Sequence, residues 1–461
     1  MIDLTVAQIA GIVGGELADI STEDATKLHV TGTVEFDSRK VTSGGLFLAL
    51  PGARVDGHDH ADSAIQAGAV AVLAARPVGV PAIVVAPAAH VAATGTGVLE
   101  HDSDGSGAAV LAALAKLAAA VATELVAGGL TIIGITGSSG KTSTKDLLAA
   151  VHSPLGEVIA PPGSFNNELG HPWTVLRATP GTDYLILELS ARHLGNIAAL
   201  AAIAPPAIGV VLNVGTAHLG EFGSREAIAQ TKSELPQAVP RSGVVVLNVD
   251  DPAVAAMAEV TTARVVRISR NRQADVWAGP VTLDELARPQ FTLHAGDTAV
   301  DISLAVHGEH HVSNALCAAA VALECGATTA QVAEALAWIS AAGGADPTGK
   351  RRSWAVLGEM AELGDDAITE HDRIGRLAVR LDVSRLIVVG TGRSMGAMHQ
   401  GAVMEGSWGE EAAIVADADA ALAVLRAELQ PGDVVLVKAS NAAGLGALAD
   451  SLTAESPGDH R

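Results

Sequence analysis

The feature that most constrains this chain is an apolar segment that runs straight into a glycine-rich turn and a lysine–threonine pair. Residues Leu130–Thr136 are followed by Gly137, Ser138, Ser139, Gly140, Lys141, Thr142 and Ser143, and a helical pattern continues to about Val151. Glycines let the backbone curl so that its N–H groups point at phosphate oxygens. The strand, turn and helix therefore predict a nucleotide-binding phosphate loop within an α/β sheet.

Each part of the predicted loop has a chemical task. Lys141 reaches the β- and γ-phosphates, Thr142 offers its hydroxyl to Mg²⁺, and the helix N-terminus adds partial positive charge. We therefore expect ATP and Mg²⁺ as cofactors. The loop is one residue shorter than the common spacing, because Ile135 stands six residues before Lys141. A chance Gly/Ser turn is the alternative, but it gives no reason for a Lys-Thr pair at the helix start.

The 461 residues suggest about three domains. Strand-like runs alternate with helical patterns, which predicts an α/β fold with parallel sheets. A polar stretch at 101–107 and a Gly-rich stretch at 341–350 mark the boundaries. We predict a small N-terminal α/β domain at 1–104, a central ATP-binding domain at 105–340 with helices on both faces of its sheet, and a Rossmann-like C-terminal domain at 341–461.

Charge and composition exclude several classes of function. The formal net charge of −22 argues against nucleic acid and anionic membrane as partners. The apolar stretch 108–136 contains Lys116 and Glu124, which argues against membrane insertion. Cys317 and Cys325 lie too far apart on one helix to bridge, and the N-terminus shows no signal peptide, so we expect a cytoplasmic protein.

Several stretches beyond the loop resemble the Mur ligase family. They are Phe36–Arg39, Asp56–Asp59, Phe165–Gly170, Leu187–Leu189, Asn213–Leu219, Asn248–Pro252, Val356–Gly364 and Pro431–Lys438. The resemblance implies ATP-dependent amide formation through an acyl phosphate, with separate domains for the UDP moiety, ATP and the incoming peptide. It is strongest to members that join D-alanyl-D-alanine to UDP-N-acetylmuramoyl-tripeptide in peptidoglycan precursor synthesis. These two substrates are therefore the expected partners of a monomeric enzyme.

A metal site follows in part from position and in part from the resemblance. Glu188 ends a buried strand, and carboxyl ends of parallel strands face the ligand crevice, so a Mg²⁺ ligand beside Thr142 explains it. By resemblance, His218 and Lys232 also serve the metal, Lys232 as a carbamate, and both join Lys141 as catalytic residues. Each residue also has an alternative without a metal. Glu188 could be a strand-end carboxylate that reaches solvent, His218 an ordinary loop histidine, and Lys232 an exposed helical lysine.

The resemblance also assigns substrate contacts. It places Ser38 and Arg39 on the UDP moiety, Asn166 and Asn167 on the muramoyl group, and Asn314 on the adenine side. Arg192 and Lys438 are expected to meet phosphate or carboxylate. Turn formation explains the Asn pair equally well, and solvated surface positions are the alternative for Ser38, Arg39 and Arg192.

One departure from the family pattern is large. Val332–Ile339 leads almost directly to the strand at Val356–Leu357, where such ligases carry an opening βα unit with the sequence Asp-Asp-x-Tyr-Asn-Ala-Asn-Pro. The gap, roughly 30–45 residues, corresponds to one βα unit. Its loss predicts an unpaired strand edge and fewer contacts to ATP. A smaller departure is Asn441, which follows Lys438-Ala439-Ser440 where relatives have Arg.

Three functions remain open from the sequence. The first is an active ligase of this type. The second is a catalytically impaired remnant that binds UDP or ATP. The third is another amide ligase with the same loop, such as a folylpolyglutamate synthetase or an earlier Mur enzyme.

Overall fold

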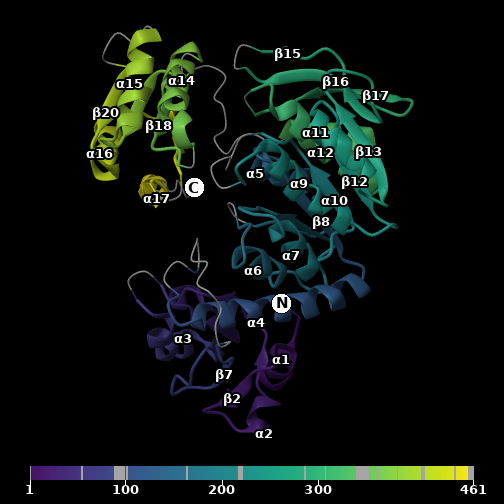
Figure 1. Ribbon diagram of the computed structural model, residues 1–461, viewed down its shortest axis with the longest axis vertical. Coiled ribbons are helices and arrows are strands. Elements are labelled where there is room, and N and C mark those ends of the chain that lie inside the picture. Colours follow the sequence, from purple (N-terminus) through teal and green to yellow (C-terminus); the bar gives the residue numbers. More distant parts are fainter. Residues whose placement is uncertain are drawn as a thin grey trace. The chain divides into compact units, whose positions relative to one another are not determined.

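The computed structural model describes residues 2–52, 55–87, 99, 102–161, 165–215, 222–284, 287–306, 308–338, 352–361, 363–381, 383–405, 411–440 and 443–454 (Figure 1). The chain forms two compact units: a first unit, up to Gly215 and from Arg225 to Ile339, and a C-terminal unit from Ser340 onward. Both units are α/β, as predicted. The break between the units lies between Ile339 and Ser340, next to the boundary predicted at 340/341. The division into three domains, with its boundaries at 104 and 340, stays a prediction.

The N-terminal part of the first unit is a mixed sheet in the order β2-β7-β6-β5-β4, with β1 and β3 paired separately. Helix α3 covers one face, over Phe47 and Val72, and α1 covers the other. Thr5 caps α1 in a reciprocal pair with Gln8. The elements are β1 (Leu4–Thr5), α1 (Val6–Val13), β2 (Glu16–Ala18), α2 (Thr22–Ala25), β3 (His29–Val30), β4 (Val34–Glu35), η1 (Ser38–Lys40), β5 (Gly45–Leu48), η2 (Gly57–His60), α3 (Ala61–Ala67), β6 (Ala69–Ala74) and β7 (Ala82–Val84).

The central sheet runs β9-β10-β8-β11-β12-β13-β14 with every neighbouring pair parallel. Its elements are α4 (Ser106–Ala127), β8 (Thr131–Thr136), α5 (Lys141–His152), β9 (Val158–Ile159), α6 (Gly170–Val175), β10 (Tyr184–Glu188), α7 (Asn196–Ile203), β11 (Ile208–Val211), α9 (Arg225–Lys232), α10 (Glu234–Ala238), β12 (Val244–Asn248), α11 (Pro252–Ala255), β13 (Arg264–Ser269), β14 (Val276–Ala278), β15 (Thr282–Leu283), β16 (Pro289–Ala295), β17 (Thr298–Ser303), α12 (His311–Glu324) and α13 (Thr329–Trp338).

Helices cover both faces of this sheet, as predicted (Figure 1). Ile133 and Ile135 of β8 point into the core beneath α5, α12 and α13, whereas Ile132 points into the core beneath α4, α6 and α7. Burial on both faces explains why the strands read as continuous apolar runs.

The prediction of an all-parallel central sheet was incomplete. Strands β15, β16 and β17 extend it with antiparallel pairs beyond β14. These strands are short or alternate between buried and more exposed residues, as β16 does from Pro289 to His294, so they lack the apolar run that marks the others.

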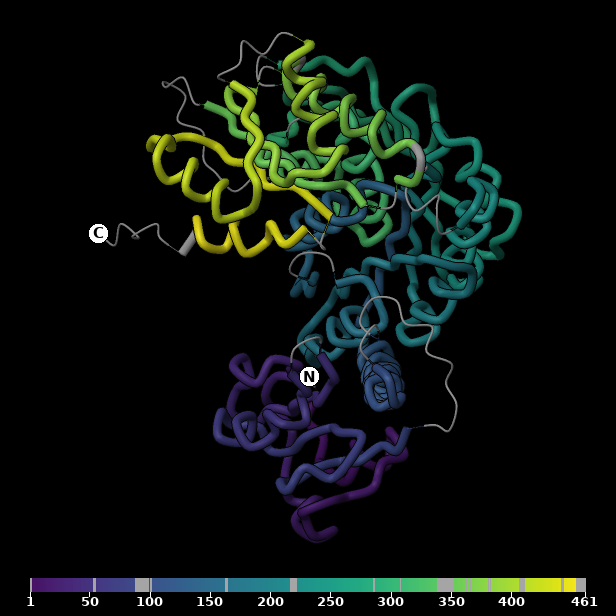
Figure 2. Tube along the Cα trace, turned by 60° about the vertical axis from the view of Figure 1, so that its left-hand side comes forward, coloured from purple at the N-terminus to yellow at the C-terminus, as the bar shows by residue number. Residues whose placement is uncertain are grey.

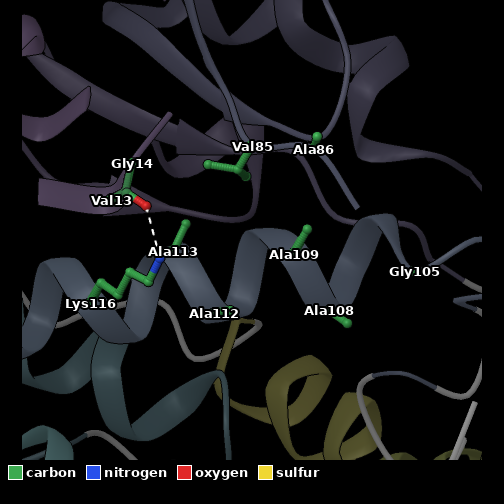
Figure 3. Close-up of a pocket in the computed structure, with 10 residues that line it drawn as sticks. All are labelled: Val13, Gly14, Val85, Ala86, Gly105, Ala108, Ala109, Ala112, Ala113 and Lys116. Carbon is green, nitrogen blue, oxygen red and sulfur yellow. Dashed lines mark hydrogen bonds between the residues drawn. The ribbon is translucent and has the colours of Figure 1, made fainter. Parts of the chain in front are cut away.

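Helix α4 joins the N-terminal part to the central part. Among the described residues it alone is long and apolar enough to pass as a membrane span, and 50% of its apolar window is buried. It packs against α1, α6 and α7. Lys116 Nζ donates to the Val13 carbonyl at 3.1 Å, beside a cavity of about 280 Å³ lined largely by small side chains (Figure 3). The apolar face of α4 therefore packs against other helices in the protein interior.

The sheet of the C-terminal unit has the order β20-β19-β18-β21, with parallel pairs throughout. Helices α14 and α15 cover one face, and α16 and α17 cover the other (Figure 2). Of its elements, β20, α15 and α17 were not predicted. The elements are β18 (Ser353–Leu357), α14 (Ala367–Arg380), β19 (Arg385–Val389), α15 (Arg393–Glu405), β20 (Ala412–Val415), α16 (Ala418–Glu428), β21 (Val434–Lys438) and α17 (Gly446–Ala454).

An open edge lies at β21. Among the described strands it pairs with β18 alone, in a register that sets Ala355 beside Leu436. Val434 is 49% exposed and Leu436 58% exposed. An uncovered edge with apolar side chains is what the missing βα unit predicted.

Candidate active site

The predicted phosphate loop joins β8 to α5 and depends on two close approaches. Gly140 has φ +84°, and a Cβ there would lie 2.8 Å from Asn314 Oδ1. A Cβ on Gly137 would lie 2.8 Å from Leu212 Cβ. Both positions therefore require glycine, and Asn314 of α12 lies directly against the loop.

Asn213, which follows β11, holds the loop in shape. Its side-chain oxygen accepts from Ser139 N at 3.0 Å, and its amide donates to Ser139 O at 3.1 Å. Gly215 N donates to Ser138 Oγ at 2.9 Å. These bonds order the loop without a phosphate, so binding costs less conformational entropy.

The part of the site that is predicted to hold Mg²⁺, called the metal side below, is formed by α5 and β10. Glu188 is fully buried at the end of β10, and Thr142 Oγ1 donates to its Oε2 at 3.4 Å. Burial raises the pKa of Glu188, whereas the charges of Lys145 and Lys141 oppose that rise. A carboxylate and a hydroxyl are hard oxygen donors of the kind that Mg²⁺ prefers. The structure thus brings together the two residues that the sequence predicted as neighbours.

Two lysines lie at the same site. Lys141 Nζ donates to the Gly137 carbonyl at 2.7 Å, and burial lowers its pKa while Glu188 opposes the shift. Lys232 ends α9 and is buried, and burial together with the charge of Lys141 lowers its pKa to about 7. His218 lies outside the described residues, so its predicted place near the metal stays a prediction.

A cavity of about 490 Å³ opens beside the loop, at the carboxyl ends of β11, β12 and β13. It is lined by Ser139, Gly140, Ser143, Leu212, Asn213, Asn248, Asp250, Asp251, Arg270, Asn271, His310, Ser313, Asn314 and Cys317. Its size and its polar rim suit the base and ribose of a nucleotide.

Sequence reasoning gave no role to Asp250, Arg270 or Asn271 in this cavity. Asp250 accepts from Ser269 Oγ at 2.6 Å and from Arg270 N at 2.8 Å, which fixes the turn after β13. Recognition of β13 as a further parallel strand would have placed Arg270 and Asn271 at the ligand edge, beside Asp250, which follows β12.

The two asparagines predicted to face the muramoyl substrate have different partners. The side chain of Asn166 hydrogen-bonds to Glu188, and the backbone carbonyl of Asn166 accepts from Ser190 N at 3.2 Å. The side-chain oxygen of Asn167 accepts from Gly170 N at 2.9 Å at the start of α6. Asn166 therefore joins the metal side of the site, and Asn167 shapes the turn before α6.

The remaining predicted contacts lie elsewhere. Arg39 is exposed, and its Nε and Nη2 donate to the Asp37 carboxylate at 2.9 and 2.8 Å. These bonds lower the pKa of Asp37 to about 2. Ser38 lies beside Arg39 in η1. Arg192 is exposed after β10, and Lys438 ends β21 in the C-terminal unit. Their roles in substrate binding stay predictions.

A phosphate loop at the carboxyl edge of a parallel sheet, with a carboxylate and a hydroxyl beside it, defines a P-loop nucleotide-binding protein. Three family models match the chain: Mur ligase family, catalytic domain at residues 31–120, Mur ligase middle domain at 135–322, and Mur ligase, glutamate ligase domain at 313–441. The chain belongs to the Mur ligase family and is an ATP-dependent ligase.

Two relatives illustrate the similarity. The chain is 69% identical to the UDP-N-acetylmuramoyl-tripeptide–D-alanyl-D-alanine ligase of Mycobacterium tuberculosis strain H37Rv, over 99% of this chain and 98% of the relative. It is 34% identical to the ligase of the same name from Synechocystis, over 91% of this chain and 92% of the relative.

Two solved structures share the fold. A crystal structure of MurF from Acinetobacter baumannii matches with a TM-score of 0.74 at 26% identity, covering 98% of this chain and 99% of that one. MurF from Thermotoga maritima in complex with ADP matches with a TM-score of 0.66 at 25% identity, covering 92% and 98%.

The alignment with the mycobacterial relative also bears on the missing unit. It spans 509 positions, whereas this chain has 461 residues, so at least 48 positions (509 less 461) have no counterpart here. Because nearly all of both chains is aligned, these gaps are internal. An internal gap was predicted, although at least 48 positions is somewhat more than the predicted length.

Proposed function

We propose that this chain joins D-alanyl-D-alanine to UDP-N-acetylmuramoyl-tripeptide, with ATP and Mg²⁺, in cytoplasmic synthesis of peptidoglycan precursors. The observation that carries the proposal is 69% identity, over almost the whole chain, to a relative whose name states that reaction. The ordered phosphate loop and the cavity beside it supply the nucleotide site that such a reaction needs. The enzyme acts as a monomer of three domains.

The residues at the loop suit transfer of the γ-phosphoryl group to a carboxylate. Lys141 offsets the charge of the β- and γ-phosphates, and the backbone of the loop orients them. Thr142, Glu188, His218 and Lys232 would hold Mg²⁺, which neutralises phosphate oxygens when bound. The substrate carboxylate takes the phosphoryl group to form an acyl phosphate, and the dipeptide amine then displaces phosphate.

Lys232 is suited to the carbamate that the family resemblance implies. Burial and the charge of Lys141 lower the pKa of the Lys232 ammonium to about 7, which makes the neutral amine more available near neutral pH. The neutral amine can add to the carbon of CO₂ and release one proton to solvent, and the resulting carbamate is an anionic oxygen donor in place of a cation. The change also removes the repulsion between Lys232 and Lys141, because one of the two positive charges disappears.

The substrate contacts extend the same proposal. Ser38 and Arg39 bind the UDP moiety, and Asn166 with Asn167 line the path of the muramoyl group. Arg192 and Lys438 meet anionic groups of the substrates. The role of Asn166 is supported by the hydrogen bond of its side chain to Glu188, the carboxylate proposed to hold Mg²⁺.

A second function is favoured by a separate observation. At least 48 internal positions of the mycobacterial relative are absent, and β21 of the C-terminal unit has an uncovered apolar edge. Both facts fit a protein that still binds nucleotide and UDP-muramoyl substrate but turns over slowly.

Phosphate release with ATP, UDP-N-acetylmuramoyl-tripeptide and D-alanyl-D-alanine tests these functions together, with the mycobacterial relative as reference. Release that requires all three substrates supports the ligase. Binding of ATP and the muramoyl substrate in thermal-shift titrations, without release, favours the impaired protein. Release with an amino-acid acceptor in place of the dipeptide indicates another amide ligase. A chain that neither binds nor releases contradicts the proposal.

A further inference from the structure

Aromatic side chains are scarce in this chain, at 2% of the sequence, yet three of them meet at one place in the first unit. The ring of Trp173 on α6 lies 5.9 Å from the ring of Phe36, which follows β4, and 4.7 Å from the ring of Phe165, which precedes α6. Aromatic pairs at such distances favour one relative arrangement, beyond the area that they bury. Trp173 thus links the N-terminal part of the first unit to its central part.

Trp173 also donates a hydrogen bond across this junction. Its indole Nε1 donates to the Val34 carbonyl of β4 at 2.8 Å, and Trp173 is only 6% exposed. Strand β4 ends the described order of its sheet, where carbonyls need partners from outside the ladder. The Arg177 guanidinium lies over the indole, 4.8 Å from the ring centroid. A backbone acceptor and a cation therefore fix the orientation of the ring that both phenylalanines contact.

Each phenylalanine leads into a turn that the proposed function assigns to one part of the same substrate. Phe36 precedes Asp37–Arg39, called the UDP turn below, and Phe165 precedes Asn166–Asn167, called the muramoyl turn. Trp173 therefore contacts the residue directly before each turn.

Each turn has hydrogen bonds of its own that do not involve Trp173. In the UDP turn, the backbone N, Nε and Nη2 of Arg39 donate to the Asp37 carboxylate. At the muramoyl turn, Gly170 N donates to the side-chain oxygen of Asn167 at 2.9 Å. The core beneath α4 separately holds the N-terminal and central parts together. The contacts of Trp173 therefore bear mainly on where the two turns lie relative to one another.

We propose that Trp173 is a positioning residue that holds Phe36 and Phe165 in a fixed arrangement, so that both turns meet one molecule of UDP-N-acetylmuramoyl-tripeptide. The inference rests on the proposed function, because it takes the two turns as substrate contacts. A ligand that spans both turns gains affinity when they are placed before it binds, whereas a ligand confined to one turn gains little. UDP alone is such a confined ligand.

The test compares Trp173→Leu and Trp173→Phe with Trp277→Leu in the full chain. Leucine removes the aromatic contacts and the indole donor, whereas phenylalanine keeps an aromatic ring and removes the donor. Trp277 on β14 stacks on His294, with ring centroids 3.9 Å apart, in the antiparallel extension of the central sheet. Trp277→Leu is thus a matched control for the loss of an indole from the same unit. Calorimetry gives dissociation constants for UDP and for UDP-N-acetylmuramoyl-tripeptide without any need for turnover.

For Trp173→Leu, the dissociation constant of UDP-N-acetylmuramoyl-tripeptide should rise about tenfold to a hundredfold, the cost of ordering two side chains on binding. The dissociation constant of UDP should stay within about threefold, because the UDP turn keeps its own hydrogen bonds. Trp173→Phe should weaken the muramoyl substrate by only about threefold to tenfold, as for loss of one hydrogen bond. Trp277→Leu should change neither constant by more than about twofold.

Equal weakening of UDP and of the muramoyl substrate in Trp173→Leu would show a general structural role and overturn the proposal. Unchanged affinity for the muramoyl substrate would overturn it as well. If Trp173→Leu does not fold, the same two outcomes in Trp173→Phe decide the question. A wild-type chain that binds no muramoyl substrate contradicts the proposed function itself, and that result is obtained before any variant is compared.

Discussion

The central sheet and the sheet of the C-terminal unit are both parallel α/β sheets, yet they differ in how completely they are covered. Helices cover both faces of the central sheet, and the phosphate loop at its edge is held by Asn213. In the C-terminal sheet, β21 ends the described order, and Leu436 is 58% exposed. The same face carries α14, whose Leu377 is 38% exposed, and Leu381, which directly follows that helix, is 63% exposed.

The difference indicates where the internal gap has its effect. The relatives' additional positions would cover apolar surface on β21 and α14, whereas the nucleotide side keeps its packing and its hydrogen bonds. An internal gap in a family member can therefore leave the phosphate loop of its central sheet intact. We expect nucleotide binding to be more robust than turnover in this chain.

The largest effect is expected at the phosphate loop of the central sheet. Lys141→Ala removes the cation beside the β- and γ-phosphates, so turnover should fall about a thousandfold, comparable to the loss of a transition-state donor. Phosphate release measures this, with the thermal unfolding midpoint recorded in parallel. Lys27→Ala, at a lysine whose side chain is 64% exposed in the turn after α2, is the control and should behave as wild type. A comparable loss of turnover in Lys27→Ala would contradict the proposed role of Lys141.

Restoring the missing segment should reduce the difference between the C-terminal sheet and the central sheet. We expect insertion of the mycobacterial relative's additional residues between Trp338 and Ser353 to raise turnover about tenfold or more, because closing contacts to ATP improve positioning. The midpoint of thermal unfolding should also rise, since exposed apolar surface becomes buried. A Gly/Ser insert of equal length is the control. Equal turnover with both inserts would place the effect of the gap elsewhere.

Lys232 provides a pH test of the intact side. Burial lowers the pKa of its ammonium from the ordinary value to about 7, so the neutral amine that adds CO₂ becomes available as the pH rises through 7. Carbamate formation, followed by ¹³C NMR with labelled bicarbonate, should increase across that range and disappear in Lys232→Met. Removal of CO₂ should lower turnover several-fold, about tenfold at most. A carbamate signal that is unchanged in Lys232→Met would assign it to another amine.

The two regions also differ in how far the sequence predicted them. The strand before Gly137, the helix after Lys141 and the meeting of Thr142 with Glu188 follow from a long apolar run and a known backbone geometry. The cavity residues after β13 were missed because Arg264 and Arg267 interrupt that strand's apolar pattern. In the C-terminal unit, β20 and α15 were missed because a short strand beside Ala- and Gly-rich helices gives a weak period. His218 and Asn441 lie outside the described residues.

The smallest effect is expected on the unfolding free energy when an exposed leucine of the C-terminal unit is replaced, and a buried leucine provides the comparison. Leu425 on α16 is fully buried, so Leu425→Ala should cost about 2–5 kcal/mol of unfolding free energy. Leu436→Ser on the open edge should change it by only about 0.5 kcal/mol, since a surface substitution removes little packing. Chemical denaturation measures both values, and binding of an apolar dye should fall in Leu436→Ser because the uncovered face becomes more polar. If Leu436→Ser instead destabilises the chain as strongly as Leu425→Ala, then β21 is covered in solution, and the contrast between the two sheets disappears.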